Sequence, residues 1–361
     1  MLIAKKVHTR GSPYMYHLNV IAIDLAKHSF HVSVLDKHGE FSVDRPFNRA
    51  ALKQWLARQA HSVVAMEACA SAHYWARLCT ALGHQPRLLT PKSVKPFREG
   101  QKTDQKDAQA IAIAACRPNV HPVAIKTVEQ QGLQAIERIR QHWVDHVTAT
   151  SNMIRGLLGE FGVVIPKGNS ALRRAIPQIL EDAENGLPDP FRHQLAQIYQ
   201  CLKGAQEELK SVERALFGLV RQQESCRQLL QLEGVGPVTA LGLYLTLGDA
   251  GANFKHGREA AACIGVTPKQ FSTGGVVSLG GIGKGMGKGR FRSALIQGAL
   301  ATVSAVDKRG PSTAKEIWLH DLVERRGKRR AAVALANKTV RTAWAMLHHD
   351  KEYRVPRQLA A

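Results

Sequence analysis

The first regular element of this chain is encoded by the stretch VIAIDL, residues 20–25. Its apolar, mostly β-branched side chains lead to a single acid, Asp24, which is typical of a buried strand that ends at a polar edge. Two more extended segments follow at residues 29–35 and 40–43, and the first of these alternates with a period of two. The pattern predicts three consecutive strands, the first over residues 19–25.

Helix and strand patterns alternate through the next eighty residues. Helices are predicted over residues 50–59, 71–82 and 104–116, and strands over residues 62–66 and 86–89. Three strands followed by helix, strand, helix, strand and helix is an α/β order, and it is the order found in ribonuclease-H-like domains. We therefore expect such a domain over residues 19–125, after an N-terminal extension of residues 1–18.

Four acids stand out in this domain. Asp24 and Glu67 each end a predicted strand, and the two strands are neighbours in a ribonuclease-H-like sheet. Asp104 and Asp107 stand three apart at the start of a predicted helix, so they share one of its faces. Four converging carboxylates repel one another unless cations are present, and hard ions such as Mg²⁺ or Mn²⁺ take oxygen ligands. We expect two such ions, which together can hold a scissile phosphate.

Each acid also has an ordinary structural explanation when it is taken singly. Asp24 could cap a turn, Asp104 could be the N-cap of its helix, and Asp107 could lie favourably near the positive end of that helix. Two strand-end acids combined with a helical Asp-x-x-Asp, in this order, are far more specific than any one of them. The combination favours a metal site.

Residues 126–230 carry a helical pattern almost throughout. One helix is predicted over about residues 129–161, and a second has apolar residues at alternating steps of four and three over four heptads. The members of this seam are Phe191, Leu195, Ile198, Leu202, Ala205, Leu209, Val212, Leu216 and Leu219. Such a seam predicts a coiled coil. We expect it to join copies of the chain into a dimer or tetramer; the alternative is an antiparallel pair within one chain.

The overall charge of the chain restricts its partners. The 361 residues carry a net charge of +21 with a pI near 10.0, which favours nucleic acid or an anionic membrane surface. No apolar run approaches the roughly 18 residues of a membrane span. The six cysteines are scattered without a Cys-x-x-Cys pair, which indicates reduced thiols rather than disulfides or a zinc site. We expect a cytoplasmic protein that binds nucleic acid and no membrane.

Residues 231–361 form the third predicted region, which is mainly helical and basic. From Lys255 to the C-terminus there are 20 Lys or Arg and 7 Asp or Glu. Residues 232–240 look like a helix-hairpin-helix turn, in which Gly234 and Gly236 permit a tight turn and the start of the next helix suits a phosphate. A plain glycine turn between two helices is the alternative.

A glycine-rich segment with interspersed cations follows at residues 265–292. Ser272 stands before Thr273 and two glycines, where its hydroxyl could be exposed on a flexible loop, although a lone Ser there is usually only a turn residue. The predicted phosphate contacts of this segment are Lys269, Lys284, Lys288, Arg290 and Arg292. The basic run at residues 325–330 predicts a solvated helix face that touches phosphates.

Five segments together resemble the DEDD transposases of bacterial insertion sequences, namely insertion sequence family 110 and its 1111 subgroup. They are AIDLAK (22–27), MEA (66–68), KTDQKDA (102–108), GVGPVTA (234–240) and TPKQFSTGG (267–275). The resemblance covers about residues 19–305, with the same order and similar spacing. It implies the fold of the RuvC Holliday-junction resolvase for the first domain, with the four acids as a catalytic, metal-binding tetrad.

The resemblance implies further properties of the C-terminal transposase domain and its partners. Ser272 matches a serine nucleophile that joins covalently to DNA, and Thr273 occupies a place where the family often has a second Ser. The partners would be double-stranded DNA at the element ends and target, and a structured, element-encoded bridge RNA that directs recombination. The acidic domain of one subunit would work with the serine domain of another, in the bacterial cytoplasm at the nucleoid.

Two other functions remain open at this stage. One is a junction-resolving nuclease that uses the tetrad and a metal-activated water, with Ser272 merely structural. The other is a nucleic-acid-binding protein with a decayed site, against which the intact tetrad argues.

Overall fold

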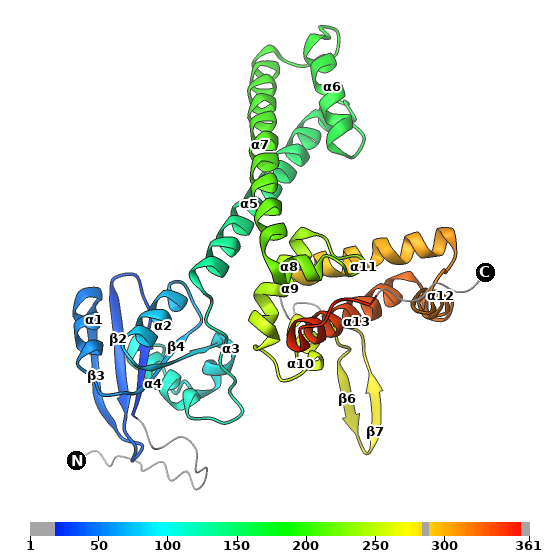
Figure 1. The fold of residues 1–361 in the computed structure, drawn as a ribbon. Helices are drawn as coiled ribbons and strands as arrows, with labels where there is room; N and C mark the ends of the chain where they lie inside the picture. Colours follow the sequence, from blue (N-terminus) through cyan, green and yellow to red (C-terminus); the bar gives the residue numbers. More distant parts are fainter. Residues whose placement is uncertain (1–18, 284–288, 355–361) are drawn as a thin grey trace. The chain divides into compact units, whose positions relative to one another are not determined.

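The computed structural model describes residues 19–283 and 289–354 of the chain. They belong to two compact units that divide between Thr127 and Val128, and each unit is described by itself (Figure 1). The predicted N-terminal extension and two predicted phosphate contacts, Lys284 and Lys288, lie outside the described residues.

The first unit is built on a five-stranded sheet in the order β3-β2-β1-β4-β5. Its strands are β1 (Val20–Asp24), β2 (Ser29–Leu35), β3 (Phe41–Asn48), β4 (Val63–Glu67) and β5 (Gln85–Leu89). β1, β2 and β3 pair antiparallel, whereas β4 joins β1, and β5 joins β4, in parallel. The predicted mixed α/β domain is confirmed. β3 continues past residue 43, where the predicted strand ends. It lies at the edge of the sheet, where Pro46 is tolerated although it has no N–H to donate.

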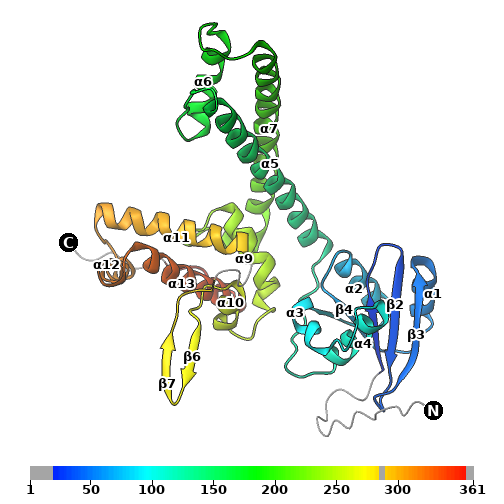
Figure 2. The same ribbon diagram turned by 180° about the vertical axis from the view of Figure 1, so that it is seen from behind.

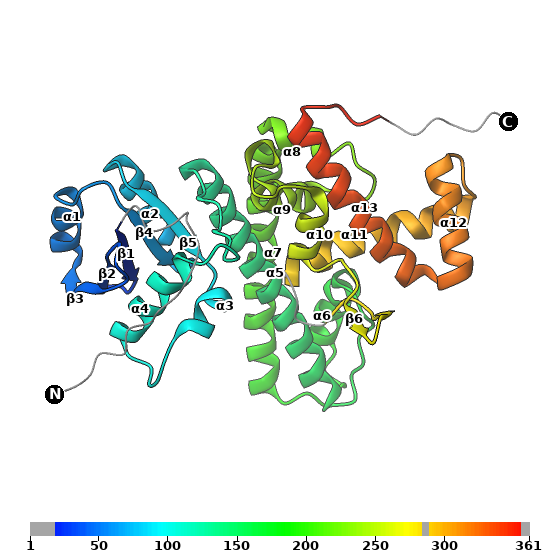
Figure 3. The same ribbon diagram turned by 90° about the horizontal axis from the view of Figure 1, so that it is seen from below.

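Helices cover both faces of this sheet, and the alternation of side chains along the strands decides which face each residue meets. Ile21 and Ile23 pack with α1 (Arg49–Ala57) and α2 (Ala72–Ala81) on one face. Val20 and Ala22 pack on the other face with α4 (Asp104–Ala115), α3 (Pro91–Val94) and the short η1 (Lys95–Phe97). Figure 3 shows α2 and α4 on opposite sides of the strands.

The second unit begins with two long helices, α5 (Val128–Gly159) and α7 (Asp189–Gln222), which pack along each other. In sequence α6 (Asn169–Glu181) lies between these helices, and in space it lies at one end of the pair (Figure 2). Leu195 and Leu202 of the predicted seam are buried with Val147 and Ile154 of α5. Part of the seam is therefore used within the chain. Sequence patterns missed α6, because its start lies in a segment rich in Gly and Pro.

The remainder of the second unit is a helical body around its own apolar core. Its elements are α8 (Glu224–Leu229), α9 (Pro237–Leu247), η2 (Asp249–Gly251), α10 (Gly257–Ile264), α11 (Gly289–Arg309), α12 (Ala314–Arg326) and α13 (Lys328–His349). From this body projects a two-stranded hairpin of β6 (Gln270–Thr273) and β7 (Val276–Leu279) (Figures 1 and 2). Among the described helices, none combines the length and apolar character that a membrane span needs.

The hairpin corrects the expectation of a flexible loop around Ser272. Gly274 and Gly275 have φ values of +56° and +79°, which is the backbone of the two-residue turns that fit the twist of paired strands. Ser272 therefore lies in β6, opposite Val277 of β7. A strand of four residues is too short for its alternation to be recognised in a single sequence.

The glycine turn between α8 and α9 is fixed by a backbone contact. Gly234 has φ +73°, and a Cβ there would lie 2.6 Å from the carbonyl oxygen of Gly298 in α11. Gly236 is the N-cap of α9, with φ −94°, and a Cβ at this position would meet nothing within 4 Å. The two glycines of the motif therefore have different roles, and only Gly234 is needed for packing.

Replacing these glycines should show which of the two the packing of the second unit needs. Gly234→Ala should destabilise the second unit by about 1–3 kcal/mol, because it combines positive φ with a backbone clash. Gly236→Ala should cost less than about 1 kcal/mol, because it changes only the N-cap of α9 and creates no clash. Urea denaturation followed by circular dichroism measures both, and equal destabilisation by the two variants would contradict the packing explanation.

Candidate active site

Asp24 and Glu67 stand at corresponding ends of two hydrogen-bonded parallel strands. Asp24 closes β1 and Glu67 closes β4, and the register pairs Ile23 with Met66 immediately before them. By alternation, both acids follow Ala22 and Ala65 onto the face that α4 covers. Both are half-buried. The fold thus brings together the two strand-end acids predicted from the sequence.

The other two acids lie in the first turn of α4, which packs across β1 and β2. The N-cap of this helix is Thr103, whose hydroxyl oxygen accepts from the Lys106 amide at 3.2 Å. The alternative role of Asp104 as N-cap is therefore wrong. Asp104 is exposed and Asp107 is half-buried, so a ligand can reach both carboxylates. Both lie in the first turn of α4, at the positive end of the helix dipole.

Electrostatic coupling links the four acids. Burial, then Asp107 and Asp104, raise the pKa of Asp24 above its ordinary value. Burial, then Asp24 and Asp107, likewise raise the pKa of Glu67. The two strand-end carboxyls are therefore harder to ionise, as expected where like charges share one face.

Two kinds of cation offset part of this repulsion. Lys102 lowers the pKa of both strand-end acids, and Arg98 lowers that of Glu67. Arg98 also donates to Asp107 across 3.3 Å. These flexible side chains leave a net excess of negative charge at the site, so the acids fit a hard divalent cation by donor chemistry and by charge.

One group of ligand-type side chains in the described residues already has its donor atoms within 4.8 Å of one another, and it lies elsewhere. It consists of His320, Asp321 and Glu324 on α12. Both acids are exposed, and His320 faces Glu324 at 3.9 Å with the i, i+4 spacing of an ordinary surface pair. Its geometry is that of a solvated helix surface. No three of the four acids, all of them described residues, have ligand oxygens within that distance of one another; they come from β1, β4 and α4 on one face of the sheet.

A fifth acid, Asp44 of β3, holds this face together, although no sequence pattern pointed to it. Its Oδ1 atom lies 2.6 Å from His31 Nε2 and its Oδ2 accepts from the side chains of Gln105 and Gln109 at 2.6 and 2.8 Å. Although burial opposes it, these hydrogen bonds hold the pKa of Asp44 below its ordinary value. Asp44 therefore clamps α4, and with it Asp104 and Asp107, to the sheet.

The chain's similarity to known proteins agrees with this architecture. Residues 21–162 match the DEDD family model of the IS110 group, described as a transposase, and residues 226–315 match the model described as transposase IS116/IS110/IS902 family. The chain belongs to the IS110 family of insertion-sequence transposases.

Relatives of full length support this assignment. A Pseudomonas aeruginosa protein bearing the name of a family 20 transposase is 38% identical over 94% of this chain and 99% of its own. The transposase for insertion sequence element IS1111A of Coxiella burnetii is 36% identical over 94% and 92%. The transposase for IS1328 of Yersinia enterocolitica is 35% identical over 92% and 97%.

The serine predicted in the second half of this transposase is accessible. Ser272 is exposed on the hairpin, and its Oγ accepts from Gln270 Nε2 at 3.0 Å. Since that oxygen is an acceptor, the hydroxyl proton is free to be donated. Lys269 is exposed at the base of the same hairpin, where its carbonyl accepts from the Gly280 amide.

Two other predicted phosphate contacts already have partners within the protein. Arg290 pairs with Asp145 of α5 at 2.9 Å. Arg292 donates to the Gly283 carbonyl at 2.8 Å, which anchors the chain after the hairpin. Arg292 therefore has a structural role in the folded chain, which sequence patterns could not reveal.

Neutralising one acid should stabilise the metal-free protein. The pKa of Asp24 is raised in the folded state. Its carboxyl group therefore favours folding at a pH below its unfolded-state pKa, and this contribution is lost as the pH rises through the folded-state pKa. In chelator at pH 8, Asp24→Asn should therefore melt above wild type, by about 2–4 °C for each kcal/mol gained. The difference should vanish as the pH falls towards about 3.9.

Asp44→Asn is the matched control with the opposite sign. The lowered pKa of Asp44 gives stability that is present at neutral pH and lost on acidification, so this variant should melt below wild type at pH 8 and approach it at low pH. Differential scanning calorimetry across this range measures both. Parallel curves for the two variants would contradict the electrostatic assignment.

Proposed function

We propose that this IS110-family transposase cleaves and rejoins DNA through a covalent serine–DNA intermediate. The observation that carries the proposal is the set of coupled acids on the α4 face, in a sheet of order β3-β2-β1-β4-β5. That order and those strand ends fit a RuvC-like fold. Asp24, Glu67, Asp104 and Asp107 would hold Mg²⁺ or Mn²⁺, which when bound neutralises charge on a scissile phosphate and activates an oxygen nucleophile.

The chain's own groups would act as follows. The Ser272 oxygen attacks the phosphorus of one DNA strand, a phosphoserine ester forms, and the bond to the leaving sugar oxygen breaks. The serine proton passes to solvent and the leaving oxygen takes up a proton. A hydroxyl of a second strand then attacks the phosphoserine, which restores the serine hydroxyl. Each step exchanges one phosphoester bond for another, so no oxidant or reductant is needed.

The remaining predicted features belong to the same proposal. Residues 19–125 would be the acidic domain, residues 126–230 the assembly region, and residues 231–361 the serine domain. The turn at Gly236 would work as a helix-hairpin-helix phosphate contact, helped by Lys269. A structured bridge RNA would direct the enzyme to its DNA, and the acids of one subunit would act with Ser272 of another.

Removing the serine hydroxyl should abolish cleavage and leave DNA binding intact. Ser272→Ala should lower strand cleavage at least about 10³-fold, the scale seen when a nucleophile is deleted. Ser278→Ala, on the neighbouring strand of the same hairpin, and Thr273→Ala should retain cleavage. Denaturing gels of DNA containing the element ends read both cleavage and covalent adduct. Cleavage without any adduct in wild type would favour a water-using nuclease instead.

Self-association through α5 has support in its exposed apolar face. Ile139, Met153 and Leu157 are 50%, 46% and 43% exposed, and their spacing of 14 and 4 residues places them on one side of the helix. Leu157 lies in the helix predicted over residues 129–161, and α7 leaves it uncovered. A second copy of the chain would bury this face in a coiled coil.

Two charges placed on this face should dissociate the assembly. Met153→Glu combined with Leu157→Glu should shift the protein to monomers at micromolar concentration, because buried carboxylates oppose association. Thr148→Glu combined with Asn152→Glu adds the same charge at exposed polar positions of α5 and should leave the assembly unchanged. Light scattering after size-exclusion chromatography gives the mass, and an unchanged mass for the first variant would exclude this face.

A further inference from the structure

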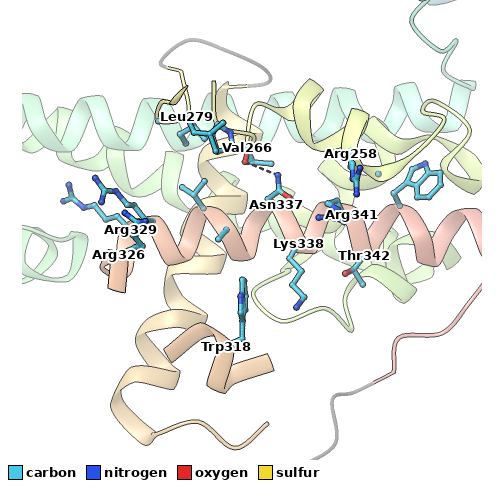
Figure 4. A pocket seen from close by; sticks show the side chains of 18 of the residues that line it. Arg258, Val266, Leu279, Trp318, Arg326, Arg329, Asn337, Lys338, Arg341 and Thr342 are labelled. Carbon is cyan, nitrogen blue, oxygen red and sulfur yellow. Dashed lines mark hydrogen bonds between the residues drawn. The ribbon is translucent and has the colours of Figure 1, made fainter. Parts of the chain in front are cut away.

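A groove of about 1650 Å³ runs along α13 in the second unit (Figure 4). Its walls come from α10, α12, α13 and the segments that precede β6 and follow β7. Six cations line it, and we call this set the α13 groove cations: Arg258, Arg326, Arg329, Arg330, Lys338 and Arg341. The volume exceeds the roughly 300–1,000 Å³ of ordinary small-molecule pockets, so the shape suits part of a polymer.

The charge of the groove is unbalanced. In the part of the chain that the structure describes, no Asp or Glu lines it, and none of the α13 groove cations forms an ion pair. All six are exposed. Cations this close repel one another within the ~10 Å screening length of physiological salt, and a chain of phosphates relieves that repulsion.

The groove is held open by close backbone packing and not by mobile side chains. A Cβ on Gly257 would lie 3.0 Å from the Cα of Arg341, so only glycine lets the start of α10 approach α13 this closely. Asn337 of α13 donates to the Val266 carbonyl at 3.2 Å (Figure 4). These contacts fix the backbones that carry Arg258 and Arg341 before any ligand binds, so only their side chains need to be ordered on binding.

An aromatic ring lies beside the charges. Trp318 of α12 lines the groove, and the Lys338 ammonium lies 4.6 Å from its ring centroid. A cation for phosphate and a flat apolar surface for sugar or base are therefore adjacent. Nucleic-acid grooves combine these two features, because phosphates supply affinity and aromatic rings accept stacked bases.

The groove continues to the base of the serine hairpin. Pro268 and Leu279 line it, and Leu279 pairs with Gln270 across the hairpin. Ser272 lies two residues beyond Gln270, or about 7 Å at the usual rise of a strand. Because phosphates along one DNA strand are spaced about 3.4 Å in axial rise, a strand in the groove would bring a phosphate to Ser272 within a few nucleotides.

We propose that the α13 groove holds the backbone of the DNA strand whose phosphate reaches Ser272. This rests on the proposed function, since it is the serine chemistry that favours DNA over RNA as the occupant. The groove cations fix the strand on one side of the attacked phosphate. The basic run at residues 325–330 thereby gains a specific use for Arg326, Arg329 and Arg330, beyond a generic solvated helix face.

The test compares two triple variants of the full chain with equal loss of charge. Arg258→Gln, Arg329→Gln and Arg341→Gln remove groove cations. Lys255→Gln, Lys308→Gln and Lys351→Gln remove exposed cations outside the groove. Fluorescence anisotropy measures the affinity for duplex DNA of mixed sequence and for duplex RNA of the same sequence, between about 50 and 200 mM salt.

The groove variant should bind DNA at least about tenfold more weakly at the lower salt concentration, with a salt slope reduced by about 2 to 3 units, since each phosphate contact contributes about 0.9. The control variant should change the slope by less than one unit. Equal slopes for both variants, or a loss confined to RNA, would overturn the proposal. Formation of the covalent serine–DNA adduct is measured separately with the wild-type protein. Absence of that adduct would refute the serine chemistry. The salt slopes for DNA binding would still decide what the groove binds.

Discussion

Carboxylates crowded on one face of a sheet repel one another, and the first unit is organised around that repulsion. Asp24 and Glu67 arrive there because β1 and β4 are parallel neighbours that end at the same edge. α4 adds Asp107 and Asp104 from its first turn. Burial and mutual repulsion raise the pKa of both strand-end acids. A fold that keeps such a cluster at a stability cost is typical of a functional site.

The second unit has the complementary character. Its helical body exposes a hairpin with Ser272 and a groove lined by cations without acidic partners. In a chain of net charge +21, the proposed function thus assigns the clustered acids to a cation and the groove cations to phosphates. Under that proposal, the positive charge serves binding and the four acids serve the chemistry.

The sequence predicted the parts of this structure that depend on local periodicity. β2 was expected over residues 29–35, where it is observed, and Asp24 and Glu67 were located because strand ends follow from apolar runs. The heptad pattern in α7 predicted a long helix but could not name its partner: Leu195 and Leu202 pack on α5 of the same chain, while Leu157 stays exposed.

Features that depend on distant residues could not be predicted. Asp44 meets Gln105 and Gln109, which lie 61 and 65 residues away, so its clamp exists only once α4 has crossed the sheet. The α13 groove depends on the closeness of Gly257 to Arg341, which no pattern encodes. The hairpin of β6 and β7 was mistaken for a loop, because two four-residue strands carry too short a pattern to separate them from a glycine-rich segment.

The proposed chemistry requires that the four acids on the α4 face bind a divalent cation. Calorimetric titration of the full chain with Mn²⁺ tests it most directly, using Asp24→Asn and Glu67→Gln beside a variant that changes Asp321 and Glu324 to Asn and Gln. Binding should be lost in the first two variants and kept in the third. Binding that survives in Asp24→Asn and Glu67→Gln, or disappears only when the α12 group is altered, would contradict it.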